Sequence, residues 1–186
     1  KILKKKFSVE KRSLLKVITE NNCIPMDSFT YALNEISVVR KDTTSMINVK
    51  TSLDGIYVNS YWSDGLIVST PTGSTGYSLS CGGPVISPSS NSLVLTPISP
   101  HNLNARPLVI SDSTKIQISV SGREDFHLLS IDAKIFTLKN ETKIYVEKSD
   151  FDIQVANINN YNFYKTLKDK WNKSFSETRN ICFFSI

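Results

Sequence analysis

The chain has 186 residues, of which 40% are hydrophobic and 21% are charged, the composition of a globular domain long enough to bury a core. Its apolar stretches have the length of strands, whereas a membrane helix needs about 20 apolar residues, so we predict no membrane-spanning helix. The formal net charge of +5 is spread along the chain, without a basic stripe interleaved with aromatic residues, which argues against a nucleic-acid partner.

The three cysteines, Cys23, Cys81 and Cys182, are far apart in the sequence. No Cys-x-x-Cys pair and no Cys/His spacing suits zinc, so they are interpreted as buried or incidental thiols of a reducing compartment. Residues 1–7 carry positive charge but are not followed by the apolar core of a signal peptide. We therefore expect a cytoplasmic protein.

The first half of the chain changes from a connector to strands. Residues 7–24 hold a connector and then an amphipathic run, for which the periodicity leaves helix and strand both open. Residues 46–53 and 56–61 alternate in polarity and meet across Asp54-Gly55. Asp-Gly between two alternating runs predicts a tight β-hairpin.

Further strands are expected at short intervals. Residues 121–125 suit a looser hairpin between the strands predicted at residues 115–120 and 126–131. Many short strands separated by turn signals predict a mostly β fold with layered, sandwich-like sheets. The predicted strands are residues 92–97, 107–110, 115–120, 126–131, 134–138 and 143–147.

The end of the chain has helical periodicity. Phe163, Leu167, Trp171 and Phe175 recur every four residues among lysines, which predicts an amphipathic C-terminal helix with one apolar stripe. Such a stripe needs a surface to pack on. Residues 178–186 match no pattern.

The most informative local pattern lies in residues 64–83, where an apolar strand runs into a turn rich in Thr, Ser and Gly. Ser74 or Thr75 is expected to cap a short helix that ends at Gly82-Gly83. Small residues let a ligand approach the backbone, and hydroxyl and N–H groups bind oxygen-rich ligands. On the residues alone an ordinary turn is the favoured explanation of this pattern. Neither a Walker ending nor the G-x-S-x-G of serine hydrolases is present.

Residues 70–80, Thr-Pro-Thr-Gly-Ser-Thr-Gly-Tyr-Ser-Leu-Ser, entered from Ser63-Asp64-Gly65, resemble the signature of the NAD kinase family. The resemblance extends over nearly the whole chain, from residue 11 to residue 173. Ordered matches of this kind are far more specific than one Gly-rich loop. The other matching segments are residues 32–36, 100–108 and 161–167.

The resemblance implies a two-domain enzyme, with an N-terminal α/β domain and a C-terminal domain of layered sheets. Residues 1–24 would then be the connector, 25–156 the β-rich NAD-binding and oligomerisation domain, and 157–186 the C-terminal helix and tail. Members phosphorylate the 2′-hydroxyl of the adenosine ribose of NAD, with ATP and a divalent metal, expected to be Mg²⁺, or with polyphosphate. They are homo-oligomers, dimers or tetramers, with NAD bound between domains and subunits.

The resemblance also implies the residues that bind NAD. Asn34 and Glu35 match the pair that contacts the adenosine half, where an amide can contact the adenine edge and a carboxylate can accept from ribose hydroxyls. Asp64 matches a carboxylate that reaches the nicotinamide end from a neighbouring subunit. Taken singly each residue suits an ordinary turn or core, but their order favours a ligand site. The loop residues that follow are Thr75, Gly76, Tyr77, Ser78, Leu79 and Ser80, with weaker matches at Ser45, Trp62, Thr72 and Lys134.

Two departures from the family pattern matter. The Gly-Gly-Asp-Gly-Thr motif, whose aspartate the family uses to activate the 2′-hydroxyl, does not occur in this sequence. We therefore expect no catalytic or metal-binding residue here and interpret the chain as part of a longer enzyme, binding NAD weakly and transferring nothing by itself. Gly76 stands where the family usually has Ala.

Other functions remain open at this point. One alternative is a non-catalytic relative that binds NAD or scaffolds another subunit. A lipid or sphingoid-base kinase is a further alternative, against which the Asn34-Glu35 pair and residues 72–80 argue. His101 and His127 have no partner suited to catalysis and are interpreted as surface or core residues.

Overall fold

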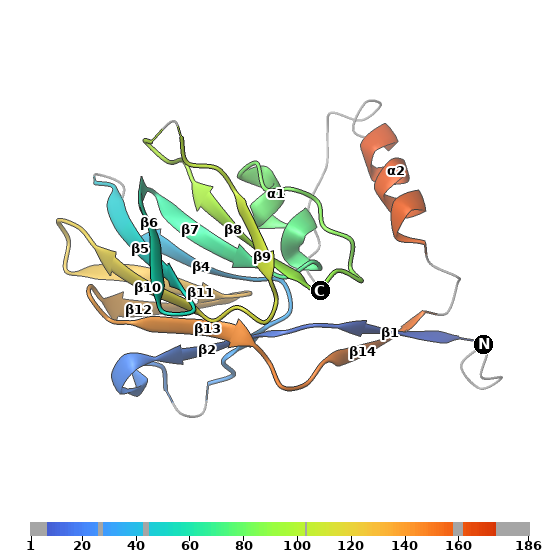
Figure 1. Cartoon of the computed structure of the whole chain (residues 1–186), viewed down its shortest axis with the longest axis horizontal. Helices are drawn as coiled ribbons and strands as arrows, with labels where there is room; N and C mark the ends of the chain where they lie inside the picture. Colours follow the sequence, from blue (N-terminus) through green and yellow to red (C-terminus); the bar gives the residue numbers. More distant parts are fainter. Residues whose placement is uncertain (1–6, 26–27, 43–44, 103, 158–161, 174–186) are drawn as a thin grey trace. The chain divides into compact units, whose positions relative to one another are not determined.

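The computed structural model describes residues 7–25, 28–42, 45–102, 104–157 and 162–173 (Figure 1). The chain divides into two compact units, residues 11–153 and residues 1–10 with 154–186. None of the helices in the described ranges has the length and apolar character needed to cross a membrane.

The larger unit consists of two six-stranded sheets in which every pairing is antiparallel. The first sheet runs, from edge to edge, through β3 (Tyr31–Ala32), β2 (Leu15–Thr19), β13 (Ile144–Lys148), β10 (Ile116–Ser121), β5 (Ile47–Leu53) and β6 (Ile56–Ser63). The second runs through β12 (Lys134–Lys139), β11 (Phe126–Ile131), β4 (Glu35–Arg40), β7 (Gly65–Ser69), β8 (Ser92–Ile98) and β9 (Leu108–Ser111).

The inner faces of the two sheets share one hydrophobic core. On β10, Ile116, Ile118 and Val120 are buried in alternation with more exposed residues, and on β11 Leu129 and Ile131 follow the same rule. All five belong to a single cluster that draws on both sheets. Face-to-face packing of this kind buries the apolar side of each sheet and confirms the predicted layered β fold.

The hairpin predicted at Asp54-Gly55 is confirmed. Strand β5 pairs with β6 from Ile47 opposite Ser63 to Leu53 opposite Ile56. Asp54 has φ 48° and Gly55 has φ 81°, the left-handed conformation that a tight two-residue hairpin turn requires. The run left open between helix and strand forms β2.

The looser hairpin predicted across residues 121–125 is wrong. Strand β10 pairs with β5 and β13, whereas β11 pairs with β4 and β12 in the other sheet. The chain therefore crosses from one layer to the other at this loop. Both strands bury alternate residues against the same core, so the alternation that predicts a strand does not reveal its sheet.

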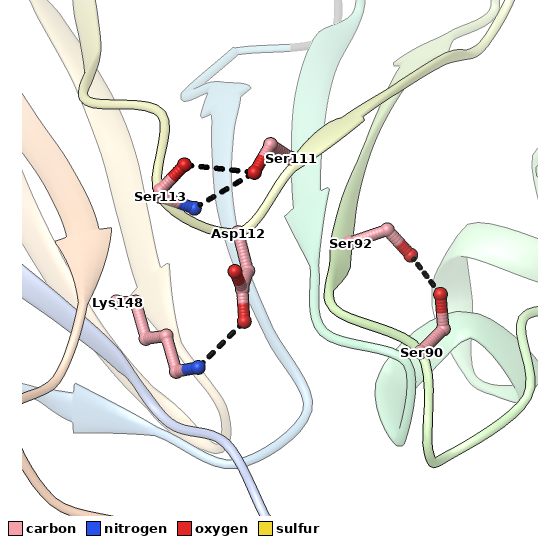
Figure 2. A network of polar contacts seen from close by, with 6 residues as sticks. All are labelled: Ser90, Ser92, Ser111, Asp112, Ser113 and Lys148. Atoms are coloured by element: carbon pink, nitrogen blue, oxygen red, sulfur yellow. Dashed lines mark hydrogen bonds and ion pairs between the residues drawn. The ribbon is translucent and has the colours of Figure 1, made fainter.

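A polar cluster joins the layers at the surface (Figure 2). Lys148, the last residue of β13, places its Nζ 2.6 Å from Oδ2 of Asp112, which follows β9 in the other sheet. Serine hydroxyls on either side of Asp112 bond to each other, Ser111 to Ser113 at 2.8 Å. The ion pair thus connects the ends of two strands from different sheets.

The smaller unit has a two-stranded sheet of β1 (Ser8–Arg12) and β14 (Ile153–Asn157) and the helix α2 (Phe163–Lys173). Asn162 caps the helix, since its Oδ1 accepts the backbone N–H of Lys165 at 3.1 Å. The predicted C-terminal helix is confirmed over these residues. Phe175, Cys182 and residues 178–186 lie outside the described ranges.

His127 on β11 is a core residue with an exposed fraction of 0%, whereas His101 is exposed. Nδ1 of His127 lies 2.9 Å from Oδ1 of Asn140, whose amide nitrogen donates to the Glu124 carbonyl. Nδ1 is therefore the protonated nitrogen, and Nε2 is buried without a hydrogen-bond partner among the described residues. Burial lowers the pKa of His127 below its usual 6.5, and the Asn140 hydrogen bond offsets this in part.

We expect acid to destabilise the fold through His127. The folded chain keeps this imidazole neutral, while the unfolded chain takes up a proton below its usual pKa of 6.5, so the free energy of unfolding falls as the pH decreases. Urea denaturation between pH 7 and pH 5 should show wild type losing stability relative to His127→Leu. His101→Gln should keep the wild-type slope, and parallel curves for wild type and His127→Leu would contradict the expectation.

Candidate functional site

Asn34 lies in the turn between β3 and β4, and Glu35 is the first residue of β4. The residue after β7, Thr70, holds this Asn34–Glu35 turn from one side. The Thr70 hydroxyl donates to the Leu33 carbonyl at 2.6 Å, and the Thr70 N–H donates to the Asn34 carbonyl at 2.9 Å. Gly73 packs on the same backbone, because a Cβ built there would lie 2.1 Å from the Asn34 carbonyl oxygen. The turn and the loop that follows β7 therefore form one unit.

Asp132, between β11 and β12, holds the turn from the other side. Its Oδ2 accepts the N–H of Leu33 at 2.7 Å, and its Oδ1 accepts the N–H groups of Asn34 at 2.9 Å and Glu35 at 3.0 Å. The Asp132 N–H donates back to the Glu35 carbonyl at 3.0 Å. Three successive N–H groups thus converge on one carboxylate.

The loop after β7 forms two short helices, η2 (Gly73–Thr75) and α1 (Tyr77–Ser80). The predicted cap at Ser74 or Thr75 is wrong, since Gly76 precedes α1 and no side chain caps it. The Ser74 hydroxyl instead turns inward, donating to the Pro71 carbonyl at 2.7 Å and accepting the Ile86 N–H at 3.0 Å. It satisfies buried backbone groups of its own loop, which the sequence pattern does not reveal.

The predicted helix end at Gly82-Gly83 is confirmed. Gly82 has φ 83°, which favours glycine, and the Gly83 N–H donates to the Ser78 carbonyl at 2.8 Å. Gly83 also packs against the Ser78 and Thr96 hydroxyls, where a Cβ would meet them at 2.2 Å and 2.8 Å. Close packing on β8 therefore fixes the position of α1.

Glu35 faces Gly76 at the start of α1. A Cβ built at Gly76 would lie 3.2 Å from Oε2 of Glu35, so the backbone of the loop approaches this carboxyl group closely. That Oε2 is buried and has no hydrogen-bond partner among the described residues. The side-chain amide of Asn34 likewise makes no hydrogen bond to a described residue. A buried acceptor without a donor costs free energy unless a ligand or water supplies one.

The surroundings of Glu35 favour its protonated form. Burial raises the pKa of Glu35 from its usual 4.5 to about 7, and the Asp132 charge acts in the same direction. The Tyr77 backbone N–H, which faces the carboxyl group, lowers this pKa in part. Glu35 therefore changes its charge near neutral pH, which is typical of residues at functional sites.

Tyr77 and Cys81 belong to the same neighbourhood. Burial raises the pKa of the Tyr77 phenol, and the charges of Cys81, Asp64 and Glu35 raise it further. Burial likewise raises the pKa of the Cys81 thiol, with a smaller contribution from Glu35. Tyr77 is 43% exposed, so its ring borders the site at the surface.

Asp64 lies where the chain crosses from β6 to β7. Its Oδ1 is 3.0 Å from Nε of Arg40, and its carbonyl accepts the Arg40 N–H at 2.9 Å. The crossing also ties to β8, because the Asp64 N–H donates to the Ile98 carbonyl at 3.0 Å. Both side chains of the ion pair are 26% exposed, so one face of the Asp64 carboxylate remains accessible.

The other predicted residues lie in different surroundings. The Ser78 side chain is fully buried, and its hydroxyl lies 2.8 Å from that of Thr96. Leu79 and Ser80 are exposed on α1, and Thr72 and Thr75 are partly buried in the loop. No hydrogen bond or ion pair within the described ranges links the remaining weaker matches to the Asn34–Glu35 turn; these are Ser45, Trp62 and Lys134.

Sequence reasoning missed Asp132 and Thr70, which hold the turn. A signal was present for Asp132, because the strands predicted at residues 126–131 and 134–138 leave only two residues for a hairpin turn. Its partners, 97 to 99 residues earlier, had no such signal. Within the described ranges, no group of three or more His, Cys, Asp and Glu side chains is arranged to hold a metal ion.

Comparisons with known proteins agree with this arrangement. Residues 33–158 match the family described as the ATP-NAD kinase C-terminal domain. An NAD kinase of Flavobacterium psychrophilum is 53% identical over 169 residues, which cover 91% of this chain and 58% of that protein. The chain thus spans little more than half the length of this curated relative.

Two solved structures share the fold. Yeast NADH kinase complexed with NADH matches with a TM-score of 0.79 at 24% identity, over 95% of this chain and 53% of that one. An NAD kinase from Archaeoglobus fulgidus in complex with ATP matches with a TM-score of 0.72 at 29% identity, over 91% and 61% respectively.

The matched segment begins beside the Asn34–Glu35 turn and contains Asp132, both short helices and the strands that position them. It covers more than half of the chain. The chain therefore belongs to the NAD kinase family and corresponds to its C-terminal domain.

Proposed function

We propose that the protein to which this chain belongs is an NAD kinase, which transfers a phosphoryl group from ATP or polyphosphate to the 2′-hydroxyl of the adenosine ribose of NAD. This chain supplies the NAD side of the reaction. The support for the activity is family membership. The support for the division of roles is that this sequence lacks the Gly-Gly-Asp-Gly-Thr motif, which the family uses on the phosphate side. Phosphoryl transfer depends mainly on positioning and charge neutralisation, so a chain without those groups binds but does not transfer.

The observation that carries the proposal is the buried Oε2 of Glu35, which has no donor among the described residues and faces Gly76 beside Asn34. An ionised carboxylate only accepts hydrogen bonds, so a ribose hydroxyl suits this position. The Asn34 amide has both donors and acceptors, as contact with an adenine edge requires. Tyr77, with 43% of its surface exposed, offers a ring at the border of the site.

The remaining partners follow from the same proposal. Mg²⁺ would arrive with the phosphates of ATP, because it is usually held by substrate phosphates and a few carboxylates. A homo-oligomer is supported by β6, an edge strand on which Ile56, Tyr57 and Val58 are all exposed. A cytoplasmic location is supported by the unpaired thiols of Cys23 and Cys81.

The first experiment is a calorimetric titration of the chain with NAD, followed by Mg-ATP and an assay for NADP in the same sample. We expect weak, saturable binding and no NADP. NADP formation would mean that the missing motif is dispensable, and the proposed division of roles would be wrong. Failure to bind NAD at any pH between 6 and 8 would contradict the proposed NAD site on this chain.

Affinity for NAD should rise with pH. A ribose hydroxyl binds the ionised form of Glu35, whose pKa of about 7 leaves only a small fraction ionised at pH 6. The apparent affinity scales with that fraction and should increase roughly tenfold between pH 6 and pH 8, with proton release on binding near neutrality. Calorimetry in buffers of different ionisation enthalpy measures both effects.

The matched controls for this titration are two glutamine variants. Glu35→Gln should bind more weakly and show no rise with pH, whereas Glu124→Gln, at an exposed position in the loop after β10, should behave as wild type. The increase of NAD affinity with pH should disappear in Glu35→Gln and persist in Glu124→Gln. An increase that persists in Glu35→Gln would assign the titration to another group.

Two glycines of the loop form a matched pair. At Gly76 an added methyl would lie 3.2 Å from both Oε2 of Glu35 and the Gly73 carbonyl oxygen, a contact that small shifts relieve, so Gly76→Ala should change NAD affinity by no more than about tenfold, or ~1.4 kcal/mol. At Gly73 the methyl would lie 2.1 Å from the Asn34 carbonyl oxygen, so Gly73→Ala must displace the turn. We expect it to weaken binding by about a hundredfold or more and to lower the melting temperature. A loss of NAD affinity in Gly73→Ala no larger than tenfold would contradict NAD binding at the Asn34 turn.

A further inference from the structure

Six backbone groups of Leu33, Asn34 and Glu35 are all hydrogen-bonded, and four of them bond to Asp132. Its carboxylate accepts the three N–H groups at 2.7–3.0 Å, and its own N–H donates to the Glu35 carbonyl at 3.0 Å. Thr70 takes the other two groups, the carbonyls of Leu33 and Asn34. The position of both candidate ligand-binding side chains therefore depends on Asp132 and Thr70.

Asp132 is itself rigidly held. It closes the two-residue turn between β11 and β12 with φ 48°, a left-handed conformation that Asp tolerates better than most residues. The Ser130 hydroxyl donates to its carbonyl at 2.8 Å, and the pairing of Ile131 with Ile36 holds the hairpin end beside β4. The carboxylate is thus delivered to the turn by sheet geometry rather than by a flexible loop.

Asp132 also contributes a charge where Thr70 contributes none. Three titratable groups interact electrostatically with Glu35. Asp132 lies in the β11–β12 turn, Tyr77 begins α1, and Cys81 follows α1. All of them are negative when ionised. Of these three side chains, only that of Asp132 raises the pKa of Glu35, so it opposes ionisation of the group that is to accept the ribose hydroxyl.

We propose that Asp132 is a positioning residue of the NAD site, because its carboxylate fixes the backbone that presents Asn34 and Glu35. The same hydrogen bonds hold its negative charge near Glu35, whose pKa it raises. The effect of the Asp132 charge on Glu35 can be tested on the chain alone, and only the consequence for NAD rests on the proposed function. Thr70 performs the same mechanical task without a charge. The two residues therefore allow position and charge to be separated.

The test is an NMR titration of the full chain with ¹³C-labelled glutamate, without ligand, in which Glu35→Gln assigns the Glu35 signal. In wild type the signal should titrate near pH 7. In Asp132→Asn, which keeps an oxygen for two of the three N–H groups, the midpoint should fall by roughly one pH unit. In the matched control Thr70→Val, which removes the hydroxyl bond to Leu33, the midpoint should stay at the wild-type value.

An unchanged midpoint in Asp132→Asn, or an equal fall in Thr70→Val, would overturn the proposal. If Asp132→Asn does not fold, Asp132→Ser keeps one acceptor and no charge, and carries the same expectation. For NAD, both variants should bind more weakly, but only Asp132→Asn should shift the pH dependence of affinity to lower pH. A wild-type chain that binds no NAD would refute the proposed function, whereas the ligand-free titration would still decide whether the Asp132 charge acts on Glu35.

Discussion

The candidate site depends on the hydrogen bonds of one short turn. The backbone N–H groups of Leu33, Asn34 and Glu35 are directed to Asp132, and the carbonyls of Leu33 and Asn34 to Thr70. Leu33 and Asn34 lie between β3 and β4, where backbone groups would otherwise be left to water or to nearby side chains. All of these backbone groups have hydrogen-bond partners within the protein. The side chains of Asn34 and Glu35 are therefore not needed to bond the backbone of the turn and remain available to a ligand.

The sheet order explains how two residues so far apart in sequence reach this turn. Strand β4 lies between β11 and β7, so the end of β7 delivers Thr70 and the turn after β11 delivers Asp132 to the same end of β4. The loop after β7 then folds back, and Gly73 sits on the Asn34 backbone where no side chain fits. The rigid sandwich therefore positions a site that consists of loops, a common division between scaffold and function.

The sequence predicted the parts of this arrangement that depend on local chemistry. A tight hairpin turn needs residues with φ above zero, and few residue types adopt this conformation, so Asp54-Gly55 predicts the hairpin. Gly82 marks the end of α1 for the same reason. Strand periodicity predicted most strands but not their partners, so β10 and β11 were assigned to one hairpin although they lie in different sheets. The contacts of Asp132 span 97 to 99 residues and follow from the sheet order, which no local pattern encodes.

The charges around the turn limit what part of a ligand it can hold. Glu35 and Asp132 are carboxyl groups, and Tyr77 and Cys81 become negative when they ionise. Arg40 lies at the opposite end of β4 from Glu35, where it is paired with Asp64 at 3.0 Å. Phosphates brought against Glu35 and Asp132 would meet like charge, whereas hydroxyl donors would meet acceptors. The proposed binding of a dinucleotide, which has both kinds of group, would therefore use its hydroxyls at this turn, and its phosphates would require neutralisation elsewhere.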